Sequence, residues 1–136
     1  MAVDNDITNI QFKPLQAWAL VPQILSMADV HLVVQKRGAA DAVLPSKLTN
    51  ILSAGGHALI TADMNTELGK IALKYPGIYQ CVEPENSETV IAGLVECLAK
   101  DTRQVNAVAR EYAVANINVD TVIDRFVGDM RALVKH

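Results

Sequence analysis

Three short apolar runs constrain the fold more than any other feature of this sequence. They are Val30–Val34, Ala58–Ala62 and Ile78–Val82, and most residues in each are apolar. Such runs are typical of strands that are covered on both faces, as in a parallel sheet. Segments with helical periodicity separate them, and strands that alternate with helices form parallel sheets with right-handed crossovers.

Further strand and helix signals complete this pattern. Ile7–Phe12 alternates weakly before Pro14 and predicts a short first strand. In the helix predicted to start near Ser87, the apolar residues expected to face the core are Val90, Ile91, Leu94, Val95 and Leu98. We therefore predict an α/β fold: a partial Rossmann-like parallel sheet of about four strands with helices on both faces. The predicted helices are Pro22–Met27, Ser46–Ala54, Thr66–Leu73, Ser87–Lys100, Thr102–Asn116 and Asp120–Lys135.

The stretch from Asp41 to Gly56 is the most informative local segment. Its loop leads into a helix that Ser46 can cap, and the glycine pair at 55–56 can end that helix in a left-handed conformation. Lys47 and Asn50 share one face of it. Helix N-termini attract anions, phosphates above all, so the segment predicts an anion-binding helix start. It lies at the carboxyl end of the predicted strands, where ligands of such sheets bind.

Composition excludes several classes of protein. The 136 residues carry 12 basic and 15 acidic side chains, a balance that argues against a nucleic-acid binder with a basic patch. The two cysteines do not form a disulfide framework, so we expect a reducing, cytoplasmic setting. No apolar run approaches the roughly 20 residues that span a bilayer. Trp18 and Tyr112 are predicted to be packed or half-buried.

The order of several motifs resembles a known family. The sequence reads ADVHLV, LPSKLTNILSAGG, TELGKIA and GIYQCVEPENSETV in turn. It resembles the C-terminal, donor-binding half of retaining glycosyltransferases with two facing Rossmann-like domains (the GT-B fold), above all the group 1 colanic-acid type. The resemblance runs from about residue 7 to the C-terminus. Single motifs are weak signals, and their order and spacing carry the specificity.

The resemblance implies a set of donor-binding residues. Ser46, Lys47 and Thr49 would contact the diphosphate of a nucleotide-sugar, and Asn50 would take the place of a glutamate that holds the ribose hydroxyls in relatives. An amide can bond a hydroxyl, but without the assistance of a charge. Asp41 would lie near the donor sugar. The nucleotide-sugar is a substrate, and no cofactor or metal is implied.

The resemblance also implies what a complete enzyme would add. A donor domain of this type begins with two further strand–helix units, which supply the arginine and lysine that clamp the diphosphate, and an acceptor domain faces it. We therefore expect residues 1–136 to form one partial donor-binding domain that is inactive alone. The complete enzyme would transfer a sugar to a saccharide or lipid-linked acceptor in exopolysaccharide synthesis. It would work in the cytoplasm, peripherally at the inner membrane.

A non-catalytic interaction module is the alternative. Without the preceding strands, Val30–Val34 would be an exposed sheet edge, and such edges pair with other chains. We expect either the first strand to move in beside it or a homodimer to form through it. Lys36 and Arg37 form a small basic site near the same loop, although solvated charge is the simpler interpretation. Ser53 lacks the context of a hydrolase nucleophile.

Overall fold

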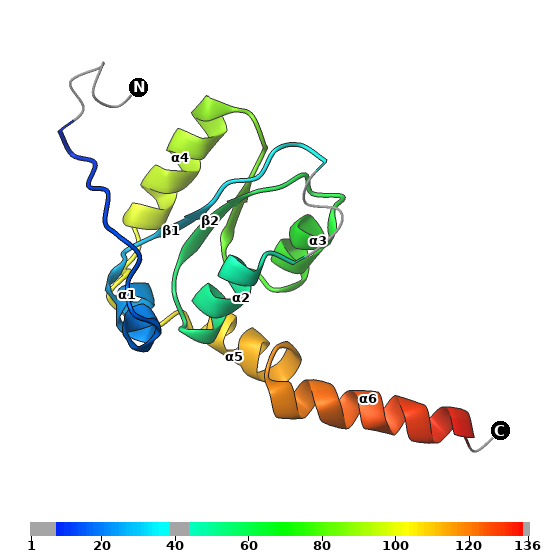
Figure 1. The fold of residues 1–136 in the computed structure, drawn as a ribbon. Coiled ribbons are helices and arrows are strands. Elements are labelled where there is room, and N and C mark those ends of the chain that lie inside the picture. Colours follow the sequence, from blue (N-terminus) through cyan, green and yellow to red (C-terminus); the bar gives the residue numbers. More distant parts are fainter. Residues whose placement is uncertain (1–7, 39–43, 135–136) are drawn as a thin grey trace.

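A three-stranded parallel sheet forms the centre of the chain. In the computed structural model, which describes residues 8–38 and 44–134, the strands are β1 (His31–Val33), β2 (Ala58–Thr61) and β3 (Gln80–Val82), in that order (Figure 1). Leu59 in β2 pairs with Leu32 on one side and with Gln80 on the other. The predicted α/β class and the parallel arrangement of the three apolar runs are confirmed.

Helices cover both faces of the sheet. On one face, α2 (Ser46–Ser53), α3 (Glu67–Lys74) and α5 (Ala107–Asn116) share a buried core with β2. On the other face, α4 (Ser87–Leu98) packs on β2 and β3. A 3₁₀ turn, η2 (Trp18–Leu20), and α1 (Val21–Met27) precede β1, while α6 (Val119–Val134) extends away from the sheet (Figure 1).

The helix α2 is fixed by burial along one face and by glycine at its end. Leu48, Ile51 and Leu52 are fully buried, as their spacing predicts. Gly55 has a φ of +68°, and its amide donates to the Leu52 carbonyl. The Gly56 amide donates to the Ile51 carbonyl at 2.9 Å, which completes a Schellman motif. The chain therefore turns directly from α2 into β2, as predicted.

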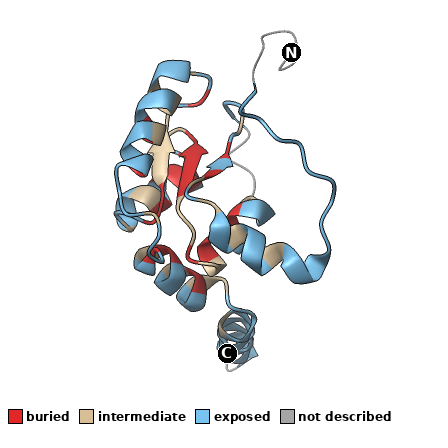
Figure 2. Ribbon diagram, turned by 90° about the vertical axis from the view of Figure 1, so that its left-hand side faces the viewer, coloured by how far each residue is buried: buried red, intermediate tan, exposed pale blue. Residues whose placement is uncertain are grey.

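The predicted first strand is wrong in the part that the structure describes. Thr8 to Ala17 forms no strand, and the Phe12 side chain is 85% exposed. This segment bends away from the body of the molecule (Figure 2). A weakly alternating run becomes a strand only where a neighbouring edge accepts its hydrogen bonds, and this run has no such partner among the described residues. The described sheet therefore has three strands rather than four.

Two apolar surfaces are less covered than the sequence predicts. Leu32 in β1 is 43% exposed, so β1 is not buried on both faces. On α4, Gly93 and Cys97 face the sheet. Of the residues predicted to face inward, two are half-buried and three are exposed: Val90 and Leu94, and Ile91, Val95 and Leu98. A glycine lets the helix axis approach the strands closely, and this contact decides which side of α4 turns inward.

Helix α5 begins later than predicted. Its first residue is Ala107 rather than Thr102, and Asn106 caps it by accepting a hydrogen bond from the Ala109 amide. The Asn106 side-chain amide also donates to the carbonyls of Gly77 and Ile78, at 2.9 and 3.2 Å. The cap thus ties α5 to the turn before β3, a tertiary role that local pattern does not reveal.

No helix within the described ranges combines the length and the apolar composition that crossing a bilayer requires.

A pair of glycine substitutions tests the close approach of α4. A Cβ at Gly93 would lie 2.7 Å from Val82 Cγ1 and 3.0 Å from Leu59 Cδ1, whereas one at Gly128 in α6 would meet nothing within 4 Å. Gly93→Val should lower the free energy of unfolding by about 1–3 kcal/mol through overpacking. Gly128→Ala should raise it by about 0.5–1 kcal/mol, since alanine favours helix. Urea unfolding followed by circular dichroism measures both, and a neutral Gly93→Val would contradict the packing described.

Candidate functional site

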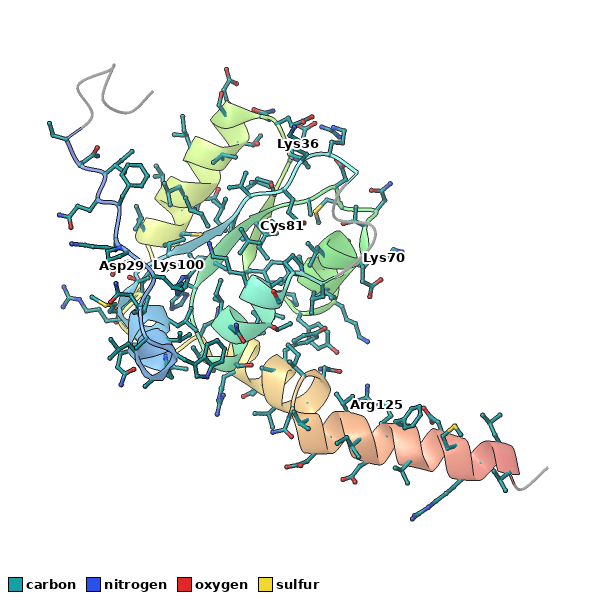
Figure 3. The ribbon with its side chains drawn as sticks, in the orientation of Figure 1. Asp29, Lys36, Lys70, Cys81, Lys100 and Arg125 are labelled. Atoms are coloured by element: carbon teal, nitrogen blue, oxygen red, sulfur yellow. The ribbon has the colours of Figure 1, made fainter. Side chains whose placement is uncertain are left out.

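Charged residues from three loops meet at the carboxyl edge of the sheet. Arg37 follows β1, Asp63 follows β2 and Glu83 follows β3. The Arg37 guanidinium donates to Asp63 Oδ1 at 2.6 Å and to Glu83 Oε1 at 2.8 Å. One arginine therefore clamps the ends of all three strands. Lys36 lies beside it at this edge, at some distance from Lys70 on α3 (Figure 3).

The ion pair between Arg37 and Glu83 shifts the pKa of both groups. Hydrogen bonds from Arg37 and Asn86 hold the pKa of Glu83 below its ordinary value, and the bond to Glu83 together with the charge of Asp63 raises the pKa of Arg37. Arg37 and Glu83 therefore both stay charged at neutral pH. Sequence reasoning treated Arg37 as solvated. A charged residue in the loop after each of three parallel strands was the signal that could have found the clamp.

The N-terminus of α2 lies at the same edge with open backbone donors. Pro45 occupies the N-cap position and offers no side-chain acceptor, and Ser46 is the first helical residue rather than the cap that the sequence predicts. The amides of Leu48 and Thr49 donate to the Pro45 carbonyl. Those of Ser46 and Lys47 have no acceptor among the described residues, and both residues are exposed. Two N–H groups at a helix N-terminus can bind an anion.

The other residues predicted to contact the nucleotide-sugar lie on or near α2. Their side chains form hydrogen bonds with different partners. Lys47 Nζ donates to the Leu32 carbonyl of β1 at 2.7 Å, and Thr49 Oγ1 donates to the Ser46 carbonyl at 2.8 Å. Asn50 is exposed one turn further along. Asp41 lies outside the described residues. The structure therefore brings Ser46, Lys47, Thr49 and Asn50 together on the first two turns of one helix.

Asn50 also borders a cavity of about 400 Å³ between α2 and the segment before β1. Its other walls are mainly apolar and come from η2, α1 and the end of α2. Trp18 lines it and is 81% exposed, so the prediction that this residue is packed is wrong, whereas Tyr112 is half-buried against Tyr75 as predicted. The cavity adjoins the face of α2 that begins at Ser46.

The two cysteine thiols are not activated as nucleophiles. Burial raises the pKa of the Cys81 and Cys97 thiols above the ordinary value, so both are protonated at neutral pH (Cys81 is labelled in Figure 3). His31 is buried and its Nε2 lies 2.9 Å from the Leu25 carbonyl, which links β1 to α1. The site thus offers backbone donors, a lysine, a clamped arginine and amide groups, which suits the binding and polarisation of an anion.

Comparison with known proteins finds a relative that is similar over nearly the whole chain. Over most of its length, the chain is similar to a glycosyltransferase, which confirms the resemblance to the colanic-acid type. The relative is a protein of Escherichia coli (strain K12) named as a colanic acid biosynthesis glycosyl transferase, WcaI. The two are 51% identical over 131 residues, which is 96% of this chain. The chain spans about a third, 32%, of the length of that relative.

No family model matches the chain, and no solved structure matches it.

The ion pair between Arg37 and Glu83 should make the stability of the folded chain depend on pH. The pKa of Glu83 is lower in the folded state than in the unfolded chain, so its stabilising contribution is complete above the unfolded value of about 4.3 and disappears as pH falls. Glu83→Gln should therefore lower the thermal midpoint at pH 7 by more than it does at about pH 3. Glu88→Gln, on the exposed first turn of α4, is the control. An equal loss for Glu83→Gln at both pH values would show that the ion pair is not its cause.

Proposed function

We propose that this chain forms the donor-binding part of a glycosyltransferase of the two-domain, retaining type. The complete enzyme would move a sugar from a nucleotide-diphosphate sugar to a saccharide or lipid-linked acceptor during the synthesis of a cell-surface polysaccharide. The similarity to the E. coli transferase supports the reaction class. The structural observation that best supports donor binding is the open N-terminus of α2 at the carboxyl edge of a parallel sheet.

The diphosphate is the part of the donor that this helix start suits best. The free amides of Ser46 and Lys47 would donate to phosphate oxygens, and the helix dipole would add to the attraction. Lys47 Nζ now bonds a neutral carbonyl, so it can exchange that partner for a phosphate. Thr49 lies at the same turn and would support this contact. Arg37, which two carboxylates neutralise, is less free to do so.

The ribose and the sugar would extend from the diphosphate in opposite directions. Asn50 lies one turn after Ser46 and can exchange hydrogen bonds with ribose hydroxyls. Asp41, in the loop before α2, would contact the donor sugar. We propose that residues 1–136 form one partial domain. The further residues that hold the diphosphate, and the acceptor domain, would come from elsewhere in the enzyme.

Transfer in the complete enzyme would depend on charge stabilisation. As the bond between the sugar and the diphosphate breaks, negative charge develops on the leaving diphosphate. The α2 amides would stabilise that charge without reorganisation, and Lys47 would add its positive charge after exchanging the Leu32 carbonyl for a phosphate oxygen. The acceptor hydroxyl would attack from the facing domain, and no metal or cofactor is required. We place this enzyme in the cytoplasm, peripherally at the inner membrane, where nucleotide-sugars meet lipid-linked acceptors. The chain alone would bind nucleotide weakly and transfer no sugar.

Calorimetric titration with uridine and guanosine diphosphates tests this assignment. Lys47→Met should weaken binding of the preferred nucleotide by about tenfold, because it removes a charge-assisted bond to phosphate. Lys70→Met, an exposed lysine on α3 (Figure 3), is the matched control and should leave binding unchanged. Equal effects of both substitutions, or no binding of either nucleotide at millimolar concentration, would contradict the proposal.

An interaction module that pairs through β1 is a second candidate. The outer side of β1 has no neighbouring strand among the described residues, and Val34 is 65% exposed beside Leu32. Addition of a strand from a second copy would satisfy the open backbone groups. Two observations weaken this candidate: β1 has only three residues, and Lys47 already bonds the Leu32 carbonyl. Lysine is a common protection of sheet edges.

A proline substitution at the β1 edge distinguishes the interaction module from the donor-binding domain. Val34→Pro removes a backbone donor at the outer strand and should abolish a homodimer formed there. The same substitution should leave nucleotide binding at α2 intact. Light scattering coupled to gel filtration measures the first property and calorimetry the second. A dimer that persists in Val34→Pro would exclude pairing through Val30–Val34.

A further inference from the structure

Gln35 carries the one buried side-chain nitrogen or oxygen that lacks a hydrogen-bond partner in the part of the chain that the structure describes. Its Oε1 atom is shielded from solvent, and no described residue donates to it. Burial of an unpaired amide oxygen costs free energy, because the hydrogen bonds that it makes with water in the unfolded chain are lost. Buried polar groups in native proteins are almost always paired, so this exception requires a physical reason.

Gln35 lies two residues after β1, at the carboxyl edge of the sheet, where ligands of parallel sheets bind. Alternation along the chain from Val33, whose side chain belongs to the core shared with α2, places Gln35 on the α2 face of the sheet. Lys47 in the first turn of α2 bonds the Leu32 carbonyl, three residues before Gln35. The unpaired oxygen therefore belongs to the same edge and the same face of the sheet as the open start of α2 (Lys36, the next residue, is labelled in Figure 3).

The backbone around Gln35 is fixed, so the position of this side chain is a property of the fold. The Gln35 amide donates to Thr61 Oγ1 at 2.7 Å, and the same hydroxyl donates to the Gln35 carbonyl at 2.8 Å. Thr61 itself is buried in β2. Two residues after Gln35, the ion pairs with Asp63 and Glu83 hold Arg37. Bonds to the neighbouring strands therefore preorganise Gln35, which is what a residue that orients a ligand requires.

The chemistry of the unpaired oxygen limits what can pair with it. An amide oxygen only accepts hydrogen bonds, so its partner must carry an O–H or an N–H group. The phosphate oxygens of a nucleoside diphosphate are acceptors at neutral pH and do not qualify. The proposed site has the ribose beside Asn50, further along α2, and the sugar on the opposite side of the diphosphate. A hydroxyl of the donor sugar is therefore the group that best suits the Gln35 oxygen.

We propose that Gln35 is a specificity residue for the donor, and that its side-chain oxygen accepts a hydrogen bond from a hydroxyl of the transferred sugar. The proposal rests on the proposed function and names the part of the donor that this residue recognises. The Gln35 side chain as a whole is half-buried, so its terminal amide can rotate toward a ligand at this edge. A sugar that lacks the hydroxyl is disfavoured, because it leaves the oxygen unpaired in the complex.

Binding of free and sugar-linked nucleotides by the full chain is the first test. The probes are the diphosphates UDP and GDP, and the nucleotide-sugars UDP-glucose, UDP-galactose, GDP-mannose and GDP-fucose. Gln35→Met should weaken binding of the preferred nucleotide-sugar by about tenfold and leave binding of its parent nucleotide unchanged, because only the sugar contacts the amide. Gln80→Met is the matched control. Gln80 is also half-buried but begins β3, at the opposite edge of the sheet, so its substitution should change neither affinity.

Thermal unfolding and amide spectra separate recognition of the sugar from a structural role of Gln35. Gln35→Met removes an unpaired acceptor, so it should leave the thermal midpoint unchanged or raise it. The side-chain amide signal of Gln35, identified by its loss from the ¹⁵N spectrum of Gln35→Met, should shift with the nucleotide-sugar and not with the parent nucleotide. A fall in the midpoint would show that a bound water or another part of the chain pairs the oxygen, and would overturn the proposal.

The outcomes distinguish the role of Gln35 from the function on which it rests. A wild-type chain that binds neither UDP nor GDP contradicts the proposed function, and the role of Gln35 falls with it. If the parent nucleotide binds, an equal effect of Gln35→Met on nucleotide and nucleotide-sugar, or no effect on either, would overturn the role of Gln35 alone. So would a chain that binds the nucleotide and none of the four nucleotide-sugars.

Discussion

Burial of one face of α2 against the sheet is the interaction on which the rest of the structure depends. Leu48, Ile51 and Leu52 are fully excluded from water, and the Schellman turn at Gly55 and Gly56 leads straight into β2. Burial of three such side chains contributes on the order of 5–9 kcal/mol before the entropy cost of folding. The same packing holds the other face and the first turn of α2 at the carboxyl edge of the sheet, where its amides are open to a ligand.

Much of this arrangement could be predicted from the sequence, because its causes are local. Apolar runs locate β2 and β3, and the spacing of three leucine and isoleucine residues with a glycine pair defines α2. Tertiary contacts explain the failures. The face that α4 turns inward depends on the distance between Gly93 and Val82, and the start of α5 depends on bonds from Asn106 across to the turn before β3. The first predicted strand needs a partner edge that is absent from the described residues.

The candidate site was predictable to a similar degree. The positions of Ser46, Lys47, Thr49 and Asn50 on one helix start follow from the motif, although their roles stay predictions. The prediction that Ser46 caps α2 was wrong, because Pro45 takes the N-cap position and leaves Ser46 inside the helix. The Arg37 clamp was missed because its partners lie 26 and 46 residues away in sequence. Its role follows from topology: parallel strands bring the residues after them to one edge, where opposite charges hold the three loops in place.

The central claim is that the N-terminus of α2 receives the diphosphate of a nucleotide. Titration of the ¹⁵N-labelled chain with a nucleoside diphosphate, followed by amide spectra, tests this most directly. The account predicts saturable shifts that are largest for the amides of Ser46 and Lys47, the two first-turn donors without an acceptor among the described residues. Shifts centred elsewhere on the sheet, or none at these two amides when the nucleotide is in excess, would contradict it.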